Sequence, residues 1–228
     1  MGFLFNGFKP SRLKSQLDLA VEWFQTSGRE MSAVLKGQTK EIANMLSCDG
    51  PEVEKVHGQV EDLIRDNNLM HAYAMLRNDC LLLSKHIKTI SSRKKCPPDL
   101  VSAVSTLIWA STYFVQTPEL QKIRAQFKYK YGEDFIADSV NNEGGVVNED
   151  VMDRLASSRN PDPKLIQVYL DKIAKDHKVD WKREEFLNIS KAPKTFIPHS
   201  MATGNLTHSF AEWVAQDIKK GNKEVFKL

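Results

Sequence analysis

The sequence lacks most of the features that mark an enzyme or a secreted protein. Its three cysteines, Cys48, Cys80 and Cys96, are odd in number and far apart, and they do not have the spacing of metal ligands. No P-loop, dinucleotide-binding glycine pattern, HExxH, GxSxG or Cys-x-x-Cys motif is present. We therefore expect reduced thiols in a cytosolic protein, with no catalytic residue, no metal site and no cofactor.

Long apolar runs and a strong excess of one charge are also absent. The uncharged run from Leu100 to Pro118 is interrupted by Ser and Thr and falls short of the ~20 mainly apolar residues of a membrane span. This run predicts a buried helix. The net charge is +3, from 32 basic and 29 acidic residues among 228. A mildly cationic, mixed surface does not favour a dedicated nucleic-acid-binding protein.

The first residues form a short apolar lead, Phe3, Leu4, Phe5 and Phe8, ahead of Lys9. Asn6 occupies the position where myristoylation requires Ser or Thr, which disfavours lipidation. The lead can either enter a bilayer interface or fold onto the helices, and we favour packing onto the helices.

What the sequence does contain is helical periodicity. Between Pro51 and Lys95, apolar residues recur at steps of three and four, with no proline until Pro97. The stripe consists of Val53, Val56, Val60, Leu63, Leu69, Tyr73, Leu76, Cys80, Leu83, Ile87 and Ile90. This pattern predicts a single helix of roughly 65 Å, which the remaining elements must pack along.

A second long helix precedes it. Ser11 is a candidate N-cap for a helix that begins near Arg12 and runs toward Ser47. The connection to Pro51 is very short, which forces the two helices into an antiparallel hairpin.

Shorter helices follow the hairpin. We expect Asp99 to cap a buried helix over Leu100 to Ala110, and Thr117 with Pro118 to open a helix that Gly132 interrupts. Asn148 is expected to cap a short helix over Glu149 to Ala156. Residues 160–163 lead into a last packed helix. The pattern predicts a helical core over residues 1–184, followed by a linker and a short amphipathic tail helix over residues 185–228.

Two groups of residues invite a chemical interpretation. Cys80 and His86 are six residues apart on one helix and so face opposite sides, which excludes a dyad and places Cys80 in the core. The run from Lys122 to Tyr131 alternates basic and aromatic residues, as single-stranded nucleic-acid binding requires. However, Ile123, Phe127 and Tyr131 share a helix face, so we favour a core stripe with a solvated basic flank.

Several short strings, collinear from about Gly7 to Glu184, carry a resemblance to a known family. They are Gly7-Phe8-Lys9, Lys40-Glu41-Ile42-Ala43, Ile64-Arg65-Asp66, Ser105-Thr106-Leu107-Ile108-Trp109-Ala110, Lys130-Tyr131-Gly132 and Tyr169-Leu170-Asp171-Lys172-Ile173-Ala174-Lys175. The sequence resembles the increased-sodium-tolerance family of ESCRT-III-like regulators of endosomal sorting.

The resemblance implies an all-α, ESCRT-III-like core, in which shorter helices pack on a long antiparallel hairpin. It implies a non-enzymatic, cytoplasmic protein that is recruited peripherally to endosomes. Such a protein binds the C-terminal helix of a charged multivesicular body protein and co-assembles with it as a polymer on membranes. It also modulates the AAA ATPase that dismantles ESCRT-III, with the activator of that ATPase as a further partner.

The resemblance also points to site residues. Basic positions that match the family are expected to contact membrane or filament, with ordinary solvated charge as the open alternative; they are Lys9, Arg12, Lys14, Lys40 and Arg65. Tyr169 and Lys172 are expected to line the groove for the partner helix. Relative to the family, residues 27–38 and 51–62 carry few basic side chains, which predicts weaker or displaced membrane binding.

The tail adds one further hypothesis and leaves two alternative functions open. The apolar spacing of its amphipathic segment fits a helix that docks on the ATPase, through Phe210, Trp213, Val214 and Ile218. One alternative function is a helical tether or scaffold that no longer polymerises. The other is an RNA-binding helical protein, for which Lys122, Arg124, Lys128 and Lys130 would be the contacts.

Overall fold

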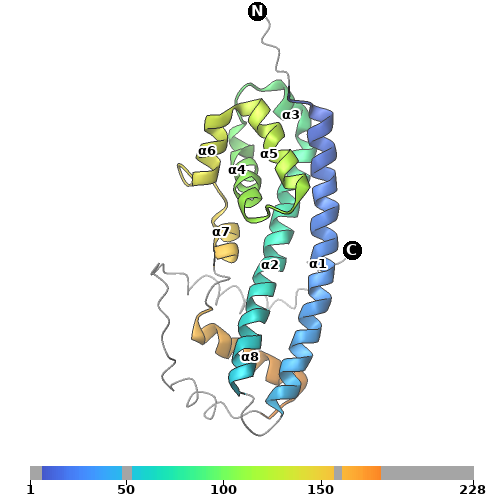
Figure 1. Cartoon of the computed structure of the whole chain (residues 1–228), viewed down its shortest axis with the longest axis vertical. Helices are drawn as coiled ribbons and strands as arrows, with labels where there is room; N and C mark the ends of the chain where they lie inside the picture. The colour runs from blue at the N-terminus through green and yellow to red at the C-terminus, as the bar shows by residue number, and fades with distance from the viewer. Residues whose placement is uncertain (1–6, 48–52, 157–160, 181–228) are drawn as a thin grey trace, which may run out of the picture. The chain divides into compact units, whose positions relative to one another are not determined.

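The computed structural model describes residues 7–47, 53–156 and 161–180, and all regular structure in these ranges is helical (Figure 1). The helices are α1 (Pro10–Leu46), α2 (Val53–Lys85), α3 (Ile87–Ser92), α4 (Pro98–Tyr113), α5 (Pro118–Tyr131), α6 (Glu133–Asn141), α7 (Glu149–Ala156) and α8 (Pro163–His177). The all-α prediction is confirmed. None of these helices combines the length and the hydropathy that crossing a membrane requires.

The chain divides into two compact units. Unit 1 comprises Met1–Lys36 and Arg65–Arg159, and unit 2 comprises Gly37–Ile64 and Asn160–Leu228. The two long helices, α1 and α2, contribute to both units. The predicted linker and tail over residues 185–228 lie outside the described residues.

The long helices run antiparallel in each unit. In unit 1, the Ser84 hydroxyl near the end of α2 donates to Asp18 Oδ1 near the start of α1, at 2.7 Å. In unit 2, Gln59 Nε2 near the start of α2 donates to Glu41 Oε1 near the end of α1, at 3.2 Å. The predicted helical hairpin is therefore confirmed, and α2 continues through Asn67 without a break.

The prediction of a single helix from Pro51 to Lys95 is wrong after Lys85. Helix α2 ends at Lys85, and His86 has φ −96° and ψ 16°, outside the helical region. The N–H of His86 is shared between the carbonyl oxygens of Leu82 and Leu83, at 3.2 and 3.1 Å. Helix α3 then resumes at Ile87. Apolar spacing did not reveal this turn because Leu83, Ile87 and Ile90 keep the helical steps across it.

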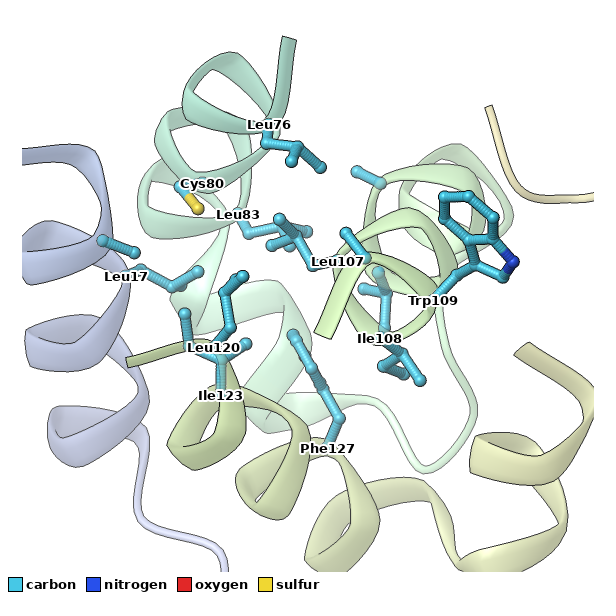
Figure 2. Packing of buried hydrophobic residues seen from close by; sticks show 14 of the residues in the cluster. Leu17, Leu76, Cys80, Leu83, Leu107, Ile108, Trp109, Leu120, Ile123 and Phe127 are labelled. Carbon is cyan, nitrogen blue, oxygen red and sulfur yellow. The ribbon is translucent and has the colours of Figure 1, made fainter. Parts of the chain in front are cut away.

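The core of unit 1 forms around α4. Ten of its side chains are buried, including Val104, Leu107 and Ile108, and α4, α5 and α6 pack against one another. Figure 2 shows side chains from four helices pointing into this core, among them Leu17, Leu76, Cys80, Leu83, Leu107, Leu120, Ile123 and Phe127. Each fully buried Leu, Ile or Phe contributes roughly 1.5–3 kcal/mol by leaving water. The uncharged run thus forms a buried helix, as predicted.

Two of the predicted helix starts need correction. Helix α1 begins at Pro10, where the Leu13 N–H bonds the carbonyl oxygen of Lys9 at 2.9 Å, so Ser11 is not its cap. Helix α4 runs from Pro98 to Tyr113, with Asp99 inside its first turn. In both helices proline occupies the first position, where its missing N–H costs nothing.

Other boundaries fall where the sequence predicts. Pro118 begins α5, and Gly132, at φ +94°, separates α5 from α6. Asn148 Oδ1 accepts the N–H of Val151 at 3.2 Å and so caps α7. The Asp162 carboxylate accepts the N–H of Lys164 at 2.8 Å at the start of α8.

Unit 2 has a simpler interior. It combines the end of α1, the start of α2 and α8, and the side chains buried in its described part are aliphatic apart from Gln167. The aliphatic ones are Ile42, Ala43, Val56, Val60, Leu63, Ile64, Ile166, Leu170, Ile173 and Ala174.

Candidate functional site

Helix α8 presents two contrasting faces in unit 2. Ile166, Leu170 and Ile173 recur at helical steps and are buried. The opposite face is exposed, and it carries Lys164, Val168, Lys172 and Lys175 at spacings of four, four and three residues. Val168 is 41% exposed, so this face combines an accessible apolar side chain with three cations.

Tyr169 and Lys172, the predicted groove residues, are neighbours on this helix. They are three residues apart; Tyr169 is half-buried at the border of the two faces and Lys172 is exposed. Lys172 Nζ forms an ion pair with Asp176 Oδ2 at 2.7 Å. The structure therefore brings together a tyrosine ring, an accessible valine and a lysine on one edge of α8. We call Val168, Tyr169 and Lys172 the α8 docking face.

An arrangement of this kind suits an amphipathic helix with acidic flanks. Such a helix places its apolar anchors, spaced by three and four residues, on apolar side chains of the receiving surface. Acidic residues beside those anchors can then reach Lys164, Lys172 and Lys175. An incoming carboxylate must compete with Asp176 for Lys172, which favours reversible binding over very tight binding.

The predicted membrane or filament residues are divided between the two units. Lys9, Arg12 and Lys14 lie at the start of α1 in unit 1 and are exposed, whereas Lys40 is exposed on the part of α1 in unit 2. Arg65 lies on α2 in unit 1.

Lys14 is already engaged within the fold. Its Nζ atom lies 2.7 Å from Asp18 Oδ2, and Asp18 also accepts the Ser84 hydroxyl. The hydrogen bond from Lys14 is the main cause that lowers the pKa of Asp18 below its usual value, assisted by Ser84. Lys14 therefore contributes to the contact between α1 and α2 as well as to the surface charge.

Arg65 lines a hollow of about 340 Å³ in unit 1. The hollow also includes Asp66, Leu69, Tyr113, Phe114, Arg154 and Leu155, which come from α2, the end of α4 and α7. Sequence reasoning did not find this hollow because its walls are far apart along the chain. Helical spacing predicts which residues share one helix face, but not which helices meet.

Residues with potential for other chemistry belong to the interior. Cys80 is fully buried, and burial raises the pKa of its thiol, as expected for a core cysteine. Burial likewise raises the pKa of the Cys96 thiol to about 11.

Phe127 is buried and stacks on Tyr131 with ring centroids 6.0 Å apart, so the basic-aromatic run forms a core stripe with a basic flank. Within the described ranges, no three His, Cys, Asp or Glu side chains gather to hold a metal.

Comparison with known proteins decides the family. Residues 14–180 match the family model described as Ist1, regulator of Vps4 activity in the MVB pathway. The chain belongs to the Ist1 family. This confirms the resemblance indicated by the collinear strings, because the strings and the family model point to the same family of regulators.

Two similar proteins illustrate the Ist1-family relationship. An IST1-like protein of Dictyostelium discoideum is 30% identical over 179 residues, which cover 77% of this chain and 47% of that protein. The chain thus spans about half the length of that relative. The solved N-terminal domain of S. cerevisiae Ist1, in complex with a Did2 MIM motif, has a similar fold with a TM-score of 0.70. It is 21% identical, and the match covers 77% of this chain and 96% of the solved chain.

Proposed function

We propose that this Ist1-family chain is a non-enzymatic adaptor that binds the C-terminal helix of a charged multivesicular body protein. The α8 docking face carries the proposal, because it places Val168, Tyr169 and Lys172 together on a helix whose opposite side is buried. The solved yeast Ist1 domain, which shares this fold, was crystallised with a Did2 MIM motif. A bound tail helix would cover Val168 and Tyr169 and place its acidic residues beside Lys172.

Calorimetry with the full chain and a peptide of the partner's C-terminal helix tests this proposal. We expect Tyr169→Ala combined with Lys172→Glu to weaken binding by at least about tenfold, the ratio that roughly 1.4 kcal/mol represents. Lys122→Glu is a matched charge control, because Lys122 is exposed on α5 in unit 1. Equal affinity of the double variant and the wild type would contradict the proposal.

The same adaptor would modulate Vps4 during endosomal sorting, with its tail as the contact to the ATPase. The amphipathic segment with Phe210, Trp213, Val214 and Ile218 is our candidate docking helix, and it lies outside the described residues. Its apolar spacing supports the proposal. Deletion of the residues after Asn205 should abolish binding to the ATPase domain that recognises ESCRT-III tails. Unchanged affinity would exclude the segment as the contact.

Membrane and filament contacts through Lys9, Arg12, Lys14, Lys40 and Arg65 also remain a proposal, as does peripheral recruitment to endosomes. Because these residues are divided between the units and Lys14 is paired with Asp18, a scaffold that binds its partner without polymerising is the second candidate. Electron microscopy of the chain mixed with its partner on anionic liposomes separates the two candidates. Filaments support co-assembly, and partner binding without filaments supports the scaffold.

A further inference from the structure

Two lysines on the exposed face of α8 form no ion pair within the fold. Lys164 lies in the first turn of the helix and Lys175 in its last turn, and both are exposed. In the part of the chain that the structure describes, no carboxylate lies within ion-pair distance of either Nζ atom. Lys172, the third lysine of this face, differs because its Nζ atom is paired with Asp176 Oδ2 at 2.7 Å. Two of the three cations are therefore available to an incoming molecule.

Lys164 and Lys175 lie on one line along α8. They are eleven residues apart, which is close to three full turns and about 16 Å along the helix axis. Val168, an exposed side chain, lies between them, one turn after Lys164 and two turns before Lys175. This line thus presents an accessible apolar side chain with a cation on each side of it.

Lys164 is poorly placed to stabilise α8 itself. The N-terminal end of a helix carries partial positive charge, so a cation in the first turn is unfavourable there. The first turn of α8 contains no acidic residue. The carboxylate of Asp162, just ahead of it, accepts the backbone N–H of Lys164 at 2.8 Å and does not pair with its Nζ atom. The charge of Lys164 therefore does not stabilise the helix that carries it.

Asp176 limits what Lys172 can contribute to binding. The two residues are one turn apart with the lysine first, which is the less favourable order for an ion pair on a helix. Asp176 also lies in the last turn, where a carboxylate is disfavoured, and the backbone N–H groups of residues 178 and 179 close the helix end without it. An incoming carboxylate gains at Lys172 only the difference between its own ion pair and the one that it replaces.

We propose that α8 selects amphipathic helices that carry two carboxylates about three turns apart, one for Lys164 and one for Lys175. An apolar side chain of the same helix would lie on Val168, between the two ion pairs. The apolar contact of the α8 docking face is limited to Val168 and Tyr169, so the two ion pairs supply most of the discrimination between one acidic helix and another. Lys172, held by Asp176, adds less than either of the other lysines.

This inference rests on the proposed function, because it describes the partner of the same site, but it can fail alone. Lys164 and Lys175 are unchanged in the variant with Tyr169→Ala and Lys172→Glu, which tests partner binding. If that variant loses binding while Lys164 and Lys175 have no effect, the partner docks on α8 without this charge pattern. If neither set of substitutions has an effect, both proposals fail.

The separation of Lys164 and Lys175 makes the test quantitative. At about 16 Å the two sites are farther apart than the screening length of ~8 Å at physiological salt, so their contributions should add. We expect Lys164→Gln and Lys175→Gln each to weaken binding of the partner's C-terminal peptide about two- to fivefold, and the double variant to lose the product of both factors. Lys172→Gln should weaken binding less than either.

Double-mutant cycles by calorimetry identify the carboxylates that pair with the two lysines. Each acidic residue of the peptide is replaced in turn by its amide, and each peptide is titrated into the full chain, as wild type and as the two single variants. The effect of each lysine should disappear with one particular peptide. The two substitutions identified in this way should lie about three turns apart in the peptide. Asp176→Asn should tighten binding of the unchanged peptide about two- to fivefold, since it releases Lys172.

Two controls separate this charge pattern from other effects. Lys88→Gln with Lys122→Gln removes the same charge from exposed sites in unit 1 and should bind like the wild type. Thermal unfolding separates binding from folding. Lys164→Gln should leave the melting temperature unchanged or slightly raised, because it removes a cation from the first turn of α8.

Three results would overturn the proposal. One is an unchanged affinity of the variant with both Lys164→Gln and Lys175→Gln. Another is an equal loss in the unit 1 control, which would indicate attraction by net charge alone. The third is coupling of both lysines to the same carboxylate of the peptide, or to carboxylates less than two turns apart.

Discussion

The two units differ in how their interiors are built. Unit 1 buries aromatic and aliphatic side chains together, and the rings of Trp23, Phe24, Tyr73 and Phe114 contact one another with centroids 5.1–6.5 Å apart. The described part of unit 2 buries aliphatic side chains from three helical segments. Since apolar burial stabilises by roughly 25 cal/mol per Å², unit 1 holds more of the stabilising area.

This difference bears on the proposed docking of a partner helix on α8. A segment with fewer buried apolar contacts opens at a lower free energy than the core around α4. Helix α8, which carries the proposed α8 docking face, lies in the smaller unit. We therefore expect partner binding to stabilise α8 locally, while unit 1 keeps the same structure in the free and the bound chain.

The largest expected effect comes from the core of unit 1. Phe127 is fully buried, so Phe127→Ala should lower the free energy of unfolding by about 3–5 kcal/mol through lost burial and a cavity. Urea unfolding followed by circular dichroism measures this. Val115→Ala is the control, because Val115 is 64% exposed and should change stability by less than ~0.5 kcal/mol. If Phe127→Ala lowers the free energy of unfolding by less than about 1 kcal/mol, the core of unit 1 is not the main source of stability, and this distinction between the units fails.

A smaller and more local effect is expected in unit 2. Leu170 is fully buried on α8, and Leu170→Ala should cost roughly 2–4 kcal/mol of local stability. Hydrogen exchange should accelerate in α8 and remain unchanged in α4. Val168→Ala, on the exposed face, should leave exchange nearly unaltered but weaken partner binding. Equal acceleration in α4 and α8 would show that the units unfold as one.

Asp79 on α2 provides a pH test of unit 1. Burial raises the pKa of its carboxyl to about 7, from a usual value near 4. The native state therefore holds a proton that the unfolded state releases, so stability falls as pH rises from about 4 to 7. Asp79→Asn should flatten this dependence and add roughly 1–3 kcal/mol at pH 8. Urea midpoints at pH 5 and pH 8 measure it, with Asp138→Asn, an exposed site, as control.

The smallest effect concerns the cap of α7. Asn148→Ala removes the hydrogen bond to the Val151 N–H and should cost about 1 kcal/mol, whereas Asn148→Asp should retain it. Thermal unfolding of the two variants gives the difference. Identical melting temperatures for both variants would mean that the cap adds nothing to the stability of unit 1.

Much of this fold could be predicted from local sequence chemistry. Periodicity indicated the hairpin and the buried α4. Thr117 and Asn148 marked helix starts correctly in position, and residues 160–163 lead into α8 as predicted. The turn at His86 could not be predicted, because apolar spacing continues across it. Pro10 and Pro98 began their helices earlier than the polar residues chosen as caps.

For the candidate site, sequence spacing could predict only which residues share a face of one helix. Tyr169 and Lys172 share an edge of α8 by spacing alone. By contrast, the hollow beside Arg65 depends on which helices meet, and its residues come from distant parts of the sequence. Of the five matched basic positions, only the three at the start of α1 lie close together in sequence.

Hydrogen exchange of the full chain, with and without the partner's C-terminal helix, tests the central claim most directly. We predict that α8 exchanges faster than α4 in the free chain and that the added helix slows exchange in α8 but not in α4. If the added helix binds and exchange in α8 stays the same, α8 is not the docking site and the account is contradicted.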